Sequence, residues 1–144
     1  WAPTAHVAVS ADLAWSHAQF ANASPAGAAV PQAVPKMARV QWMLNDLQGW
    51  SAGLGLRHVA ARPLLSDRSA WAPSSTTLDL RVLRQVSDAW QWGLEVLNLT
   101  DRKNIDAAYA YVSRLAGEPM GGISDVHLHP AWPRTWRLLM AWRP

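Results

Sequence analysis

Six stretches of the sequence alternate large apolar residues with polar or small ones over about ten positions each. In the fifth stretch, for example, Trp90 and Trp92 lie on one side of the alternation and Gln91 lies on the other. A period of two indicates β-strands, and no apolar stripe with the helical period is comparably long. The sequence therefore predicts an all-β chain with antiparallel strands, which cover residues 6–15, 37–45, 50–60, 77–86, 89–98 and 134–143.

The connections between these strands alternate between short and long. The short ones are "DLQG" after the second strand and "SD" after the fourth, whereas residues 16–36, 61–76 and 99–133 form three long connections. Long structureless connections are uncommon in a compact soluble domain. Outer-membrane barrels have short turns at one end and long external loops at the other, and a tilted ten-residue strand spans their apolar band of about 25 Å. We therefore expect the three long segments to be external loops.

The composition agrees with strands that have one lipid-facing side. Half of the 144 residues are hydrophobic and only 16% are charged, but the mean hydropathy is close to zero, as expected if alternate residues line a polar lumen. No run of 18 apolar residues predicts a membrane-spanning helix. Tryptophan is enriched and lies near strand ends, where an indole suits the membrane interface, at positions 15, 50, 90, 136 and 142.

A soluble β-sandwich has the same alternation, with the apolar stripes buried between two sheets, and remains an alternative as a ligand-binding module. Six strands are also too few for a transmembrane barrel, which needs about eight so that no strand edge is left unpaired in hydrocarbon. If the apolar side faces lipid, the chain is part of a larger barrel or assembles with other copies into a pore.

Three segments carry a family resemblance: "VPKMARVQWMLND…WSAGLGLRHVAARPL", "SSTTLDLRVLRQVSDAWQWGLEVLNLTDRKN" and the "PRT" at 133–135. In order and spacing they resemble the C-terminal third of the barrel of TonB-dependent outer-membrane receptors, over residues 6–143. The resemblance implies a barrel of about 22 strands, in which residues 1–144 supply the last six, and an N-terminal plug that this chain lacks.

The same resemblance implies a function and partners. Such receptors sit in the outer membrane of Gram-negative bacteria and take up scarce nutrients, above all iron–siderophore complexes, with energy supplied through TonB. The implied partners are outer-membrane lipid, the plug, TonB and a small-molecule ligand. The chain begins at Trp1 without an initiator Met, so we expect a mature or truncated piece. It ends in Pro144 where the family usually has an aromatic residue, and a terminal proline cannot donate a ladder hydrogen bond, which predicts weaker insertion.

Candidate ligand contacts lie in the longest connection. "DVHLHP" would place His127 and His129 on one side of an extended segment, and Tyr109, Tyr111 and Arg114 precede it. These side chains suit contact with an iron chelate or another small molecule. The spacing fixes no third ligand, so no metal site is assigned.

The remaining charged residues indicate structure rather than catalysis. Ser, His and Asp occur in no arrangement of nucleophile and base, so no enzyme and no cofactor are expected. The net charge of +3 is too small and scattered for nucleic acid, and the absence of Cys excludes disulfides. Gly53 and Gly55 would give room for a plug or for strand bending. The lumen-side charges are expected to pair across strands or with the plug: Arg39, Arg57, Asp79, Arg81, Glu95 and Arg137.

Overall fold

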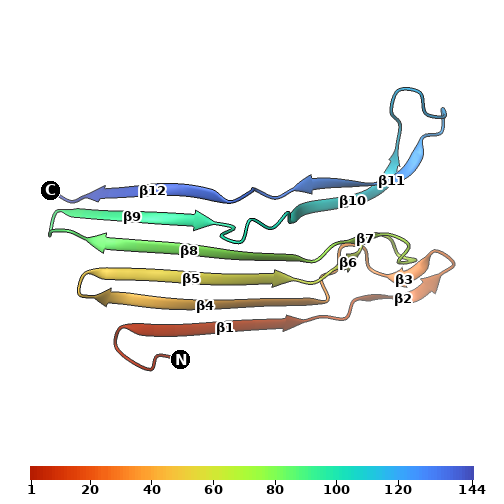
Figure 1. The fold of residues 1–144 in the computed structure, drawn as a ribbon. Coiled ribbons are helices and arrows are strands. Elements are labelled where there is room, and N and C mark those ends of the chain that lie inside the picture. Colours follow the sequence, from red (N-terminus) through yellow and green to blue (C-terminus); the bar gives the residue numbers. More distant parts are fainter.

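Six long strands form one antiparallel sheet in the order β1-β4-β5-β8-β9-β12 (Figure 1). The structure is a computed structural model that describes the side chains of residues 1–22 and 25–144. No helix long and apolar enough to span a membrane occurs among the described residues. The strands of the sheet are β1 (Val7–Trp15), β4 (Lys36–Leu47), β5 (Trp50–Val59), β8 (Ser75–Gln85), β9 (Trp90–Leu97) and β12 (Thr135–Trp142). All six lie within two residues of the predicted ranges, which confirms the predicted antiparallel sheet.

The three long connections contain two-stranded ribbons that the sequence pattern did not predict. All three lie at one end of the sheet, and the short turns lie at the other (Figure 1). The ribbon strands are short, alternate alanine with larger residues, or, in β11, alternate few large apolar residues, so their apolar pattern is weak. They are β2 (Gln19–Ser24) with β3 (Gly27–Ala29), β6 (Arg62–Pro63) with β7 (Trp71–Ala72), and β10 (Ile105–Ser113) with β11 (Ile123–Pro130).

The strand register collects the large apolar side chains on one face of the sheet. Residues directly opposite each other in an antiparallel pair point to the same side. One row of such partners crosses all six strands, from Val9 to Trp42, Leu54, Leu80, Val96 and Trp136. The neighbouring row on the opposite face runs through Met43, Gly53, Arg81, Glu95 and Arg137. The two faces are therefore apolar and polar, as the alternation predicts.

No second sheet covers the apolar face within the described part of the chain. Among these residues Val96 is the only large side chain that is fully buried, whereas Trp136 is 60% exposed and Leu138 is 88% exposed. Contact of such an area with water would be unfavourable by about 25 cal/mol per Å². The soluble sandwich alternative is therefore wrong, because its defining feature is a second sheet packed on these side chains.

The sheet is open at both edges. Its order begins at β1 and ends at β12, and the outer edge of β1 meets only the chain's own first residue, since Trp1 and Val9 exchange two backbone hydrogen bonds of 2.8 and 3.0 Å. Unpaired edge N–H and C=O groups are costly in hydrocarbon. If the apolar face contacts lipid, further strands or further copies must continue the sheet.

Asn98 joins the end of β9 to the segment that leads into β12. Its side chain is buried, donates hydrogen bonds to the carbonyl oxygens of Arg102 (2.9 Å) and Trp132 (3.2 Å), and accepts one from the Arg102 amide (3.1 Å). The backbone here has a φ of 51°, a left-handed conformation that asparagine adopts more readily than most residues. This explains the asparagine that opens "NLTDRKN".

Two segments of the family-like pattern, "NLTDRKN" and "PRT", meet through Asp101 and Arg134. The carboxylate of Asp101 accepts a hydrogen bond of 2.9 Å from the backbone of Arg134 and lies 3.8 Å from its guanidinium. Asn104, also buried, exchanges hydrogen bonds of 3.1 and 2.8 Å with the backbone of Thr76 at the start of β8. Side chains of "NLTDRKN" thus fix how β8, β9 and β12 emerge into the ribbon end.

The orientation of the sheet can be tested at Leu80, in the middle of an apolar row. A Leu80→Arg substitution places a charge on that face and should cost about 2–4 kcal/mol of unfolding free energy in a lipid bilayer. Gln85→Arg, on the polar face near a turn, should cost less than about 1 kcal/mol. Unfolding by denaturant in lipid vesicles measures both values, and equal effects would contradict the assignment of faces.

The junction can be tested by Asn98→Ala. The substitution removes three hydrogen bonds and puts alanine in a left-handed conformation, so we expect a loss of about 3 kcal/mol. Asn45→Ala, at an exposed position at the turn end, is the matched control. Denaturant titrations of the folded protein in detergent compare the two variants; indistinguishable midpoints would show that the Asn98 hydrogen bonds do not stabilise the junction.

Candidate functional site

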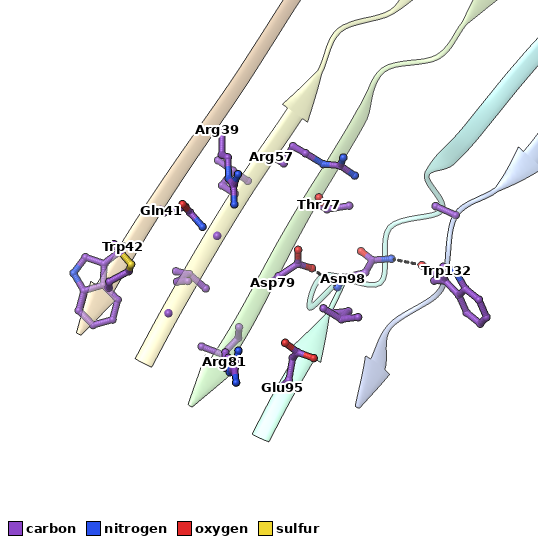
Figure 2. A pocket seen from close by; sticks show the side chains of 18 of the residues that line it. Arg39, Gln41, Trp42, Arg57, Thr77, Asp79, Arg81, Glu95, Asn98 and Trp132 are labelled. Carbon is purple, nitrogen blue, oxygen red and sulfur yellow. Dashed lines mark hydrogen bonds between the residues drawn. The ribbon is translucent and has the colours of Figure 1, made fainter. Parts of the chain in front are cut away.

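The polar face of the sheet forms an open groove of about 720 Å³ (Figure 2). Its floor contains Gly53 and Gly55 of β5, which lie opposite Arg81 and Asp79 of β8. A Cβ atom built on either glycine would meet nothing within 4 Å. Among the described residues the space above these glycines is therefore open, and it gives room for another molecule or another part of a protein.

Part of the charge that lines the groove is neutralised within the sheet. Arg137 of β12 donates to a carboxylate oxygen of Glu95 at 3.2 Å, and Arg81 lies opposite Glu95 on the other neighbouring strand. The carboxylate of Asp79 accepts a hydrogen bond of 2.8 Å from the backbone of Asn98 (Figure 2). Interactions between neighbouring strands thus balance the charges at one end of the groove.

Two arginines of neighbouring strands lie at the other end of the groove. Arg39 of β4 and Arg57 of β5 lie directly opposite each other, an arrangement that is unfavourable for like charges. Asp12 lies opposite Arg39 on β1, but neither arginine forms an ion pair with a described carboxylate. The groove lining as a whole has three arginines and three carboxylates, so the positive charge is local: it lies over β4 and β5, where it suits an anionic group.

The loop end of the groove contains residues that the sequence analysis did not select. Asn98, Asp106 and Trp132 line it there. The family-like run "NLTDRKN" points to Asn98, but nothing in the local pattern of Asp106 or Trp132 indicates that the chain returns to this place. Their position depends on contacts between β9 and the segment before β12.

Four of the five candidate ligand contacts share one face of the β10–β11 ribbon. Tyr109 lies opposite His127, and the alternation puts Tyr111 and His129 on the same side. The rings of Tyr111 and His127 are stacked, with centroids 4.0 Å apart and planes inclined by 16°. Nε2 of His127 is buried and has no hydrogen-bond partner among the described residues. We call Tyr109, Tyr111, His127 and His129 the ring face.

Arg114 is not part of the ring face. It follows β10 in the turn at the tip of the ribbon, where its Nε donates a hydrogen bond of 3.2 Å to the carbonyl oxygen of Glu118. The Glu118 carboxylate in turn accepts a hydrogen bond of 2.6 Å from the Leu115 amide. This local turn holds the guanidinium at the far end of the ribbon.

The opposite face of the ribbon packs on its neighbour and so fixes the ring face outward. Ala108 is buried against Leu64 and Ala72 of the β6–β7 region. Gln32, from the segment between β3 and β4, donates a hydrogen bond of 2.6 Å to the Ala108 carbonyl and accepts one of 2.9 Å from Arg62. The three ribbons therefore support one another, although each is too small to be stable alone.

The described residues include no group of three His, Cys, Asp or Glu side chains that could hold a metal ion. The two histidines on β11 share one face with Asp125, but the three do not form such a group. Chemically, the ring face offers aromatic stacking and imidazole nitrogens, and the groove offers guanidinium groups. Both suit binding rather than bond cleavage.

Comparison with known proteins agrees with the fold. No family model and no curated protein sequence matches the chain. The ferric-catecholate import receptor Fiu from Escherichia coli K12 superimposes with a TM-score of 0.73 and 19% identity over 97% of this chain and 19% of that one. The siderophore receptor PiuA from Acinetobacter baumannii gives a TM-score of 0.75 and 14% identity over 98% of this chain and 20% of that one.

This chain spans about a fifth of the length of either receptor, and the two structural relatives are receptors rather than enzymes. At these identities the likeness concerns the fold. The expected resemblance to the barrel of TonB-dependent receptors is confirmed at that level: the chain has the fold of a segment of a siderophore-receptor barrel.

Proposed function

We propose that the chain forms the last six strands of a barrel of about 22 strands in an outer-membrane receptor. This receptor takes up a scarce nutrient, a ferric siderophore in the first instance, with energy supplied through TonB. The observation that carries the proposal is the uncovered apolar face that crosses all six strands in register. The fold shared with the ferric-catecholate receptor Fiu supports the class of ligand.

In this proposal each face of the sheet has its own partner. The apolar face contacts lipid of the outer membrane of a Gram-negative bacterium, and the open edges of β1 and β12 pair with other strands of the barrel. The polar groove faces the lumen, where a plug domain supplied by the rest of the receptor lies over Gly53 and Gly55. The unpaired charges of Arg39 and Arg57 then meet anionic groups of that plug or of the passing ligand.

The ring face is proposed as the first ligand contact. It lies on the long-loop end of the sheet, which is the external end if the short turns face the periplasm (Figure 1). Tyr109, Tyr111, His127 and His129 can stack against the flat aromatic groups of a catecholate chelate, and Arg114 at the ribbon tip adds a positive charge. No metal ion resident in the protein is required, because iron arrives inside its chelate as cargo.

Deletion of the gene that encodes the chain tests the proposed function. In the host grown under iron limitation, deletion should abolish growth on a supplied ferric catecholate, and plasmid complementation should restore it only when TonB is present. Uptake of radiolabelled iron as the chelate gives the direct measurement. Unchanged uptake in the deletion strain contradicts the proposal, and rescue without TonB contradicts the energy source. A heat-modifiable oligomer of 15.9-kDa chains would instead indicate a pore built from several copies.

Substitutions on the ribbon test the ring face. Tyr111→Ala or His127→Ala removes one ring of the stacked pair and should weaken binding of the ferric chelate about tenfold, because an aromatic contact is worth about 1–1.5 kcal/mol. Leu128→Ala, equally exposed on the opposite face of β11, is the control and should leave the affinity unchanged.

Chelate binding is measured by quenching of intrinsic fluorescence on whole cells or on the purified receptor. Wild-type affinity in both ring variants would contradict the ring face while leaving the transport proposal intact. Surface labelling with an antibody confirms that each variant reaches the membrane in equal amount.

A further inference from the structure

Arg84 is the one arginine on the apolar face of the sheet among the described strands. Its register partners are Trp50 on β5 and Trp92 on β9, so it stands between two indoles in a row across three strands. The next row along the same face contains Ala52, Val82 and Leu94. Arg84 therefore lies two residues along β8, about 7 Å, from Val82, where the fully apolar rows begin.

Local contacts hold the Arg84 side chain in place. The guanidinium carbon lies 5.0 Å from the centre of the Trp50 ring, and one terminal nitrogen donates a hydrogen bond to the carbonyl oxygen of Gln48 in the β4–β5 turn. The side chain is half-buried and forms no ion pair with a described carboxylate, including Asp46 and Asp88 in the two adjacent turns. A guanidinium has five N–H donors, so most of them remain without a protein acceptor.

The surroundings of Arg84 match the level of lipid headgroups. Trp90 and Trp142 lie on the same face at the same end of the sheet, with ring centroids 6.2 Å apart. Indoles concentrate where acyl chains meet headgroups, because the ring is apolar and the N–H needs a polar partner. A fixed cation at this level, with apolar rows on one side and the turns on the other, suits an anion whose remainder is hydrocarbon.

We infer that Arg84, bracketed by Trp50 and Trp92, binds the phosphodiester group of a phospholipid. The phosphate accepts two parallel hydrogen bonds from the free edge of the guanidinium, and the acyl chains extend along the strands, across the row that contains Val82 and Leu94 and the apolar rows beyond it. A free phosphate ion would use the guanidinium alone and gain nothing from those rows. This inference rests on the proposed orientation of the apolar face toward lipid, and it adds a specific lipid site at the short-turn end.

Native mass spectrometry of the detergent-extracted, assembled protein tests the site. The probes are phosphatidylglycerol, a diacylglycerol with the same acyl chains, and inorganic phosphate. We expect Arg84→Gln to lower the affinity for phosphatidylglycerol about fivefold, and Arg84→Lys to have an intermediate effect because lysine keeps the charge but not the fork. Arg143→Gln, a loss of the same charge at the same end of the sheet, is the matched control and should have no effect. Diacylglycerol should bind all variants equally weakly, and millimolar inorganic phosphate should not displace the lipid.

Several results would overturn the lipid site. Wild-type retention of phosphatidylglycerol by Arg84→Gln would do so, as would an equal loss in Arg143→Gln, which would indicate diffuse attraction. Displacement by inorganic phosphate would indicate a site for the free anion. Quenching of the tryptophans by brominated lipid in vesicles checks the orientation separately: no quenching in any variant contradicts the proposed function itself. Quenching with no effect of Arg84→Gln contradicts only the lipid site. Arg84→Lys keeps the test informative if the glutamine variant does not assemble.

Discussion

Backbone pairing across the six strands fixes the side of the sheet on which every side chain lies. Because residues in register share a face, a slip of β5 by one position would move its apolar residues, such as Leu54 and Leu56, to the polar side. The register instead collects most of the large apolar side chains on one face and most of the charged side chains on the other. The absence of a covering layer in the described residues, the open edges and the groove all follow from this one arrangement.

The two faces of the sheet differ in which of their side chains have a protein partner. The apolar face lacks a protein partner and carries its only described arginine at one end, held by an indole and a turn carbonyl. The polar face has its charges balanced at Glu95 and Arg137 but leaves Arg39 and Arg57 opposite each other. Like charges in register persist when something else compensates them, and the bare glycine floor beside them leaves room for it. Neither face of the sheet is thus covered by the described residues. Lipid hydrocarbon suits the apolar face, and an anionic group or a plug domain suits the polar face.

The ribbon end has a different source of stability. Here buried asparagines and local hydrogen bonds replace an extensive apolar core: Asn98 and Asn104 fix the exits of the strands, and Gln32 connects two ribbons through the Ala108 carbonyl. The small cluster around Leu64, Ala72 and Ala108 completes the support. A recognition surface on such a base can present Tyr111 and His127 in a defined stack even though most of the ribbon is exposed.

The alternation of side chains determined the strands, their two faces and the short and long connections, because period two is a local property that each segment carries independently of the others. The sequence also places Tyr109, Tyr111, His127 and His129 in one long connection. Only the tertiary structure decided that these rings share one ribbon face while Arg114 turns to Glu118, since that depends on the pairing register of β10 and β11. The same holds for the contact of Asp101 with Arg134 and for the place of Arg84 between Trp50 and Trp92, because residues far apart in the chain meet only after the strands have paired.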